Sequence, residues 1–89
     1  MLKRYWFIPS PQDKYGVDNI GVTAFTLIEA KGIIKNAFSK VNWKHISEIE
    51  IDKAEVIENI NIELLDKSHI IPNMGVVTFK GVWFPCLNL

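Results

Sequence analysis

The chain has 89 residues, 48% of them hydrophobic and 22% charged, and its ten basic side chains balance ten acidic ones. A chain of this length holds one hydrophobic core, and this composition excludes intrinsic disorder. A pI near 6.7 argues against a dedicated nucleic-acid binder, and the lack of a long apolar run argues against a membrane span.

The N-terminal segment and the single cysteine indicate a cytoplasmic protein. The apolar run from Tyr5 to Ile8 is too short for the hydrophobic region of a signal peptide. Cys86 has no second cysteine for an internal disulfide, which fits a reducing compartment. We therefore expect a single domain over residues 1–89, in the cytoplasm and without a membrane partner.

The first half of the chain predicts two strands and one helix. Residues 2–8 are rich in aromatic and branched side chains and stop at a proline, so they predict a strand. After a loop, residues 21–25 predict a second, shorter strand or an extended segment that enters the helix. The run Thr26-Leu27-Ile28-Glu29 matches the capping box that begins helices, and we expect a helix over residues 27–39. The apolar residues with helical spacing are Leu27, Ala30, Ile34, Ala37 and Phe38.

The second half predicts further strands. Residues 41–52 remain open among strand, helix and loop, with a slip in the period-two pattern near Asp52. Residues 54–62 predict a strand, residues 63–66 a single helical turn, and residues 76–84, apolar on both faces, a central strand. The expected fold class is α+β, with one main helix packed on a small, mostly antiparallel sheet of three to five strands.

Charge is distributed unevenly along the chain. Residues 1–46 carry a net charge of +4, residues 47–66 carry −6, and residues 67–89 carry +2. If residues 48–52 form a strand, Glu48, Glu50 and Asp52 share one face at a spacing of about 7 Å, and neighbouring pairs repel by about 0.6 kcal/mol in water. A basic partner would convert this repulsion into attraction, so the acidic run predicts a docking surface.

Candidates for catalysis and metal binding are few. His45, His69 and Cys86 lack the tight local spacing of a zinc site, and no glycine-rich phosphate loop is present. Glu58 falls on the Val56 face of its predicted strand, where it either lies near the sheet edge and pairs with a lysine or acts as a perturbed acid. We expect no enzyme activity, no metal and no cofactor, and an enzyme remains the third alternative, with Glu58 and His69 as its candidate acids.

The predicted helix also carries a basic face. Lys31, Lys35, Lys40 and Lys44, with Trp43 beside them, are most simply a solvated surface. Contact with RNA through this face is the alternative, although a nucleic-acid binder normally carries a denser basic stripe.

Two segments carry a resemblance to known sequences. The chain resembles a group of small, largely uncharacterised bacterial proteins that share a G-V-T-A entry to a helix and end in I-P-N-M-G…G-V-W-F-P. The matching residues here are Gly21 to Ala24, Ile71 to Gly75 and Gly81 to Pro85. The resemblance brings no catalytic residues, and by its class it implies an accessory protein similar to the immunity partners of bacterial toxins.

The leading hypothesis is a cytoplasmic immunity protein, or antitoxin, that binds and neutralises a cognate toxin domain through an acidic surface. A nuclease is the expected toxin, because its cleft must be positive to hold phosphates. The alternative is a homo-oligomer, such as a homodimer, or a complex subunit without catalytic activity, whose many aromatic residues mark an interface. The residues expected to contact the partner are Glu48, Glu50, Asp52, Glu55, Glu63, Asp66 and Trp43.

Overall fold

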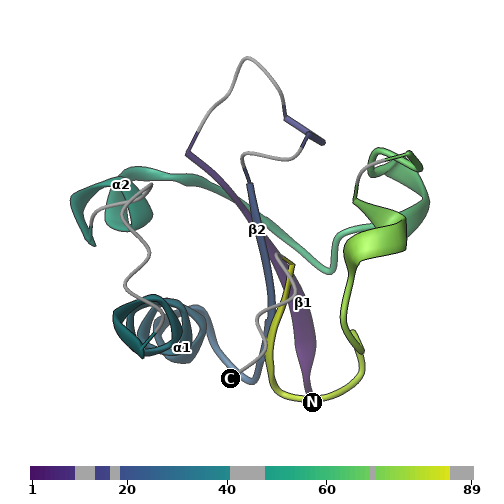
Figure 1. The fold of residues 1–89 in the computed structure, drawn as a ribbon. Helices are drawn as coiled ribbons and strands as arrows, with labels where there is room; N and C mark the ends of the chain where they lie inside the picture. Colours follow the sequence, from purple (N-terminus) through teal and green to yellow (C-terminus); the bar gives the residue numbers. More distant parts are fainter. Residues whose placement is uncertain (10–13, 17–18, 41–47, 69, 85–89) are drawn as a thin grey trace.

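The α+β prediction is confirmed. The computed structural model describes residues 1–9, 14–16, 19–40, 48–68 and 70–84. One main helix packs on a four-stranded antiparallel sheet in this part of the chain (Figure 1). In chain order the elements are β1 (Lys3–Ile8), β2 (Ile20–Ala24), α1 (Leu27–Lys40), α2 (Glu48–Lys53), β3 (Glu55–Glu58), two 3₁₀ turns η2 (Ile62–Leu64) and η3 (Ile71–Asn73), and β4 (Gly81–Phe84).

The sheet has the strand order β3-β1-β2-β4, and all three neighbouring pairs are antiparallel. β1 and β2 pair from Lys3 opposite Ala24 to Phe7 opposite Ile20. Against β4 the register of β2 shifts between Gly21 and Val22, which marks a bulge. The two helices lie on one side of the sheet, and the segment that follows β3 lies on the other (Figure 1).

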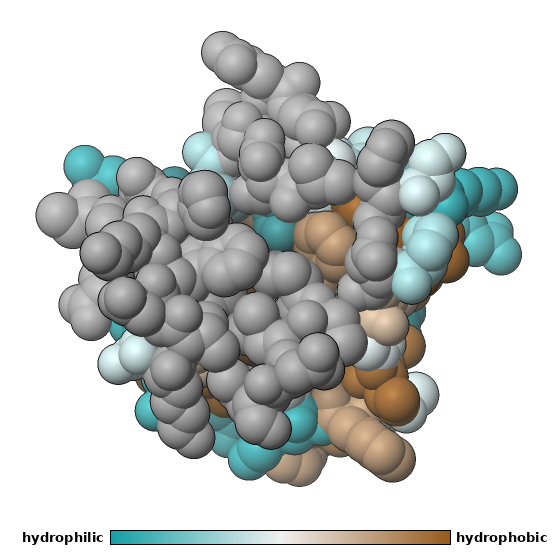
Figure 2. Space-filling model, in the orientation of Figure 1, coloured by the Kyte–Doolittle hydropathy of each residue, from teal (hydrophilic) through white to brown (hydrophobic). Residues whose placement is uncertain are grey.

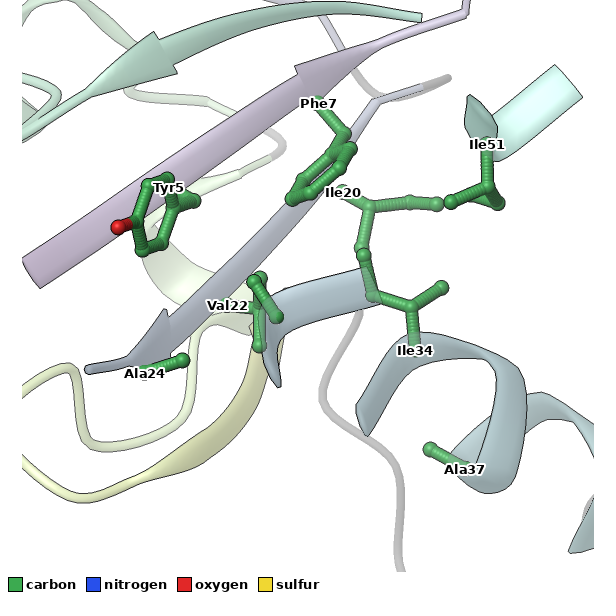
Figure 3. Packing of buried hydrophobic residues seen from close by; sticks show 9 residues of the cluster. Tyr5, Phe7, Ile20, Val22, Ala24, Ile34, Ala37 and Ile51 are labelled. Atoms are coloured by element: carbon green, nitrogen blue, oxygen red, sulfur yellow. The ribbon is translucent and has the colours of Figure 1, made fainter. Parts of the chain in front are cut away.

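The first face of the sheet packs against the helices. Alternate residues of β1 and β2 point to this face, and Ile34 and Ala37 of α1 and Ile51 of α2 meet them (Figure 3). Ala30, Ile34 and Ala37 are buried, so the helical stripe predicted from their spacing is confirmed for these three. Leu27 is 38% exposed and lies outside the core, and the side chain of Phe38 lies outside the described residues.

The second face is covered by the irregular segment between β3 and β4. Trp6 of β1 and Trp83 of β4 stack there with ring centroids 5.6 Å apart and planes 18° apart. Gly21 of β2 makes this contact possible, because a Cβ at this position would overlap the six-membered ring of Trp83. The Trp6 indole N–H donates to the Lys14 carbonyl at 2.8 Å, so the buried ring keeps a hydrogen bond. The other buried members of this cluster are Ile8, Ile60, Leu65, Ile70 and Phe84.

The strand predicted over residues 54–62 is shorter than expected, because β3 ends at Glu58. Asn59 has φ of 56°, in the left-handed region that asparagine tolerates, and the chain turns out of the sheet there. The Ile60 N–H then donates to the Arg4 carbonyl at 3.1 Å, and Arg4 Nε donates to the Ile60 carbonyl at 3.2 Å. Ile60 therefore enters the second cluster and does not share the face of Val56.

The prediction of a central strand over residues 76–84 is wrong. β4 begins only at Gly81 and is an edge strand, while the preceding residues turn back along the sheet. The Thr23 hydroxyl donates to the Val77 carbonyl at 2.6 Å, and the Gly75 N–H donates to the Trp83 carbonyl at 2.7 Å. The apolar pattern indicated burial on both faces. An edge strand is also buried on both faces when helices cover one face and a loop covers the other.

Two shorter segments are helical. The sequence leaves residues 41–52 open among strand, helix and loop; residues 41–47 lie outside the described residues, and α2 (Glu48–Lys53) is a short helix. The helical turn predicted at residues 63–66 is η2, which begins one residue earlier. Its N-cap is Asn61, whose side chain accepts from the Glu63 N–H at 3.1 Å.

The capping box begins α1 as predicted, with one difference. The Thr26 hydroxyl accepts from the Glu29 N–H at 3.1 Å, but the Glu29 carboxylate accepts from the Phe25 N–H at 2.9 Å and not from the amide of Thr26. The bond from Phe25, and secondarily the nearby Lys80 ammonium, hold the pKa of Glu29 below its usual value.

Replacing Gly21 by alanine is expected to destabilise the fold by roughly 1–3 kcal/mol, because the added methyl overlaps the buried ring of Trp83. Gly32 is the matched control, since nothing lies within 4 Å of a Cβ added there. Gly32→Ala is expected to stabilise α1 by about 0.5–1 kcal/mol. Urea denaturation measures both free energies of unfolding, and a Gly21→Ala variant as stable as Gly32→Ala would contradict the packing described.

Glu29 is expected to titrate below the usual range of glutamate, measured by NMR at its side-chain carboxyl carbon. Because the pKa is lowered in the folded state, its contribution to stability is present above the usual pKa and is lost as pH falls through the lowered value. Phe25→Pro, which removes the amide donor, is expected to raise the pKa of Glu29 more than Lys80→Met does. A larger effect of Lys80→Met would show that the Lys80 ammonium, and not the Phe25 N–H, is the main cause of the lowered pKa.

Candidate protein-binding surface

Asp52 is paired with lysines of the main helix. Ile51 anchors α2 in the first core, and the next residue along α2, Asp52, faces α1. Lys35 Nζ lies 3.3 Å and Lys31 Nζ 4.0 Å from Asp52 Oδ1. Two basic residues of the first half of the chain thus neutralise a carboxylate of the acidic run.

The acidic residues of β3 lie on an edge strand. Glu55 and Glu58 are exposed at its two ends, while Val56 and Ile57 between them pack toward the first and second cores. Lys14 Nζ lies 3.5 Å from Glu55. Lys3 Nζ lies 2.5 Å from Glu58, which confirms that Glu58 lies at the sheet edge and pairs with a lysine.

Asp52, Glu55 and Glu58 therefore follow one another from the end of α2 along the outer strand of the sheet, and we name these three residues the acidic edge. Their side chains are 54%, 54% and 52% exposed although each is ion-paired. The sequence placed Glu58 among possible catalytic acids and not in the docking surface. Glu58 does share the face of Val56, as its spacing in the sequence predicted, and its pairing with Lys3 keeps the carboxylate at the surface.

The earlier part of the acidic run is helical. Glu48 and Glu50 lie in the backbone of α2, but their side chains and Trp43 lie outside the described residues. Because residues 48–53 are helical, the strand spacing of about 7 Å predicted for the acidic residues at positions 48, 50 and 52 does not apply.

Glu63 and Asp66 lie on the other side of the sheet, in the segment that covers the second face. Figure 1 shows this segment, in green, well apart from α2. Asp66 organises a turn: its Oδ1 accepts from the Ser68 N–H at 2.8 Å, and its carbonyl accepts from Ile70 at 3.0 Å. Of the residues predicted to contact a partner, Asp52 faces α1, while Glu55 lies opposite Ile8 and so projects on the side of the second face. Glu63 and Asp66 lie in the segment that covers this second face.

The basic face predicted on the main helix is locally neutralised. Lys31 and Lys35 both lie against Asp52, so neither is available as an isolated phosphate contact. The side chain of Lys40, together with Lys44 and Trp43, lies outside the described residues.

The other candidate chemistries fall largely outside the described residues. His45, His69 and Cys86 are not among them. Within the part of the chain that is described, no three histidine, cysteine or acidic side chains gather to hold a metal ion. The described helices also include none with the length and apolar character needed to cross a bilayer.

Comparisons with protein-family models, with curated proteins and with solved structures give no match to this chain. The resemblance to small bacterial proteins thus stays a prediction. Its quoted residues do have a packing role here: Gly21 lies under Trp83, all of β2 is buried, and Gly75 bonds to the Trp83 carbonyl.

Neutralising Glu58 is expected to lower the pKa of Lys3. The hydrogen bond and charge of Glu58 hold that pKa above the usual lysine value, so the pair contributes stability below the usual pKa and loses it as pH rises through the raised one. NMR titration of the Lys3 Cε protons measures the change in Glu58→Gln. Glu55→Gln is the control, because Glu55 pairs with Lys14. An equal pKa change in both variants would contradict the assigned pair.

Proposed function

We propose that this chain is a protein-binding domain of the immunity type, which neutralises a toxin by docking its acidic edge on the toxin's basic surface. The observation that carries this proposal is the position of Asp52, Glu55 and Glu58. Their side chains are about half exposed, Asp52 at the end of α2 and Glu55 and Glu58 on the outer strand β3 of the described sheet, and a lysine pairs with each of them.

A basic side chain of a partner can replace the lysine in each of these ion pairs. An exposed lysine–carboxylate pair is worth about 0–1 kcal/mol, so a partner's arginine or lysine can replace the chain's own lysine at little cost. The displaced lysines return to solvent. Long-range attraction between the carboxylates and a basic partner also raises the association rate.

The edge strand offers a second means of binding. β3 is the outermost strand of the described sheet, and the hydrogen-bonding groups of such an edge can pair with a strand of another protein. Glu55 and Glu58 at its two ends discourage pairing with another acidic edge and favour a basic strand.

A nuclease domain is the toxin class that fits best, since its substrate-binding cleft must be positive. Under this proposal the protein acts in the bacterial cytoplasm, forms a stoichiometric complex and uses neither catalysis nor a cofactor.

Binding to a basic nuclease toxin domain encoded beside the gene for this chain is expected to depend on the acidic edge. The triple variant Asp52→Asn, Glu55→Gln, Glu58→Gln is expected to raise Kd at least tenfold at low salt, with a smaller difference at high salt because screening removes the attraction. Calorimetry measures Kd, and nuclease assays measure the loss of protection.

A single-site comparison controls for general charge effects. Glu55→Gln is expected to weaken binding several-fold, whereas Glu63→Gln, at an exposed glutamate of η2 outside the acidic edge, should leave Kd within about twofold. Equal losses in the two variants, or binding unchanged in the triple variant, would rule out the acidic edge as the docking surface.

A further inference from the structure

A second surface lies at one end of the sheet and is apolar. Exposed apolar side chains come from two segments that meet there: the junction of β2 with α1, and the turn before β4. They are Phe25, Leu27, Ile28, Val76 and Phe79, with exposed fractions of 51%, 38%, 85%, 59% and 72%, and we name them the apolar end.

Three contacts bring the two segments together. Thr23 pairs with Gly81 in the sheet, and the Thr23 hydroxyl bonds to the Val77 carbonyl. Lys80 Nζ lies 5.7 Å from the centre of the Phe25 ring, so the residue next to Phe79 crosses to the start of α1. Figure 1 shows the turn before β4 and the junction of β2 with α1 along the lower edge of the molecule, and Figure 2 shows brown and tan atoms at its lower right.

The fold does not require these side chains to be apolar. None of the five belongs to either core cluster, although Ala24 and Val77 beside them do. A phenylalanine buries 150–250 Å² when covered, so the two phenylalanines and Ile28 together expose on the order of 300–400 Å². The largest apolar patch of a monomer is usually about this size and often has a function.

The charges in this surface are mixed. Glu29 and Lys80 lie beside Phe25, with Lys80 Nζ 3.4 Å from Glu29 Oε2, and their side chains are 34% and 49% exposed. A partner of a single charge sign would bring a like charge against one of them. A surface that carries both signs within an apolar surround is complementary to itself.

We propose that the apolar end binds a second copy of this chain, forming a two-fold symmetric dimer. In such a dimer each surface meets its own copy, so Lys80 of one chain approaches the partner's Glu29, while the phenylalanines and Ile28 exclude water around them. The zero formal net charge of the chain leaves no long-range repulsion between copies.

The dimer goes beyond the proposed toxin binding and does not depend on it. Glu55 lies opposite Ile8, where β1 ends, whereas the apolar end lies beside Ala24, opposite Lys3, where β1 begins. Of the acidic edge, Glu58 pairs with Lys3 and therefore lies nearer the apolar end, whereas Glu55 lies at the other end of β3 and stays open in the dimer. Toxin binding and dimer formation are measured separately, so each can fail without the other.

Sedimentation analysis of the purified chain, from about 10 µM to about 1 mM, tests the proposal in the range where small interfaces associate. The expected result is a concentration-dependent monomer–dimer equilibrium. Phe79→Ser is expected to raise the dimer Kd at least tenfold, and Leu64→Ser, at an exposed leucine of η2, should change it less than twofold. A monomer at every concentration, or equal effects of the two variants, would overturn the proposal.

A charge exchange tests the symmetry. Lys80→Glu alone and Glu29→Lys alone are each expected to be monomeric, because like charges then meet across the axis. An equimolar mixture of the two is expected to form a dimer, because the opposite charges are restored between unlike copies. Failure of the folded variants to associate in the mixture would overturn the two-fold arrangement. Glu29 also caps α1, so circular dichroism is used to check that each charge variant folds. If one of them does not fold, the comparison of Phe79→Ser with Leu64→Ser decides the question.

Discussion

Trp6 and Trp83 stack across Gly21, and the architecture of the second sheet face depends on this contact. In the described chain no α-helix covers that face, so the two indoles supply much of the apolar area that a helix would otherwise bury. The bulge beside Gly21 leaves Trp83 as the extra residue of β4 and allows its ring to cross β2 toward Trp6. β2, with every residue buried, is the strand on which both faces are built.

Local signals predicted the first half of the fold well. The capping box fixed the start of α1, and the spacing of Ala30, Ile34 and Ala37 gave its buried side, because both depend on residues within a few positions of one another. β4 was misplaced because an apolar pattern indicates burial on both faces but not strand order. α2 was left open because six residues with alternating Ile and Glu suit a strand or a helix equally, and its packing on α1 decides between them.

The candidate surface was only partly predictable for the same reason. The negative run at residues 47–66 suggested one acidic face, but three of its carboxylates pair with Lys3, Lys14 and Lys35 from the first half of the chain. Lysines of the positive first half therefore form ion pairs with carboxylates of the negative run. The paired lysines and carboxylates lie far apart in the sequence. The distribution of charge along the chain therefore shows the imbalance but does not show which carboxylates stay half exposed.

The tryptophan stack also joins strands from the two ends of the chain. β1, β2 and α1 come from one continuous stretch of 38 residues, Lys3 to Lys40, and can form by contacts between neighbouring segments. The ring of Trp83 reaches Trp6 only after a loop of nearly the whole chain has closed, and contacts of such high sequence separation slow folding. Closure of this loop is therefore expected to be a late step, and until it occurs Trp6 lacks the ring that stacks on it in the folded chain. Chains that have not yet closed the loop are expected to be the most prone to aggregate.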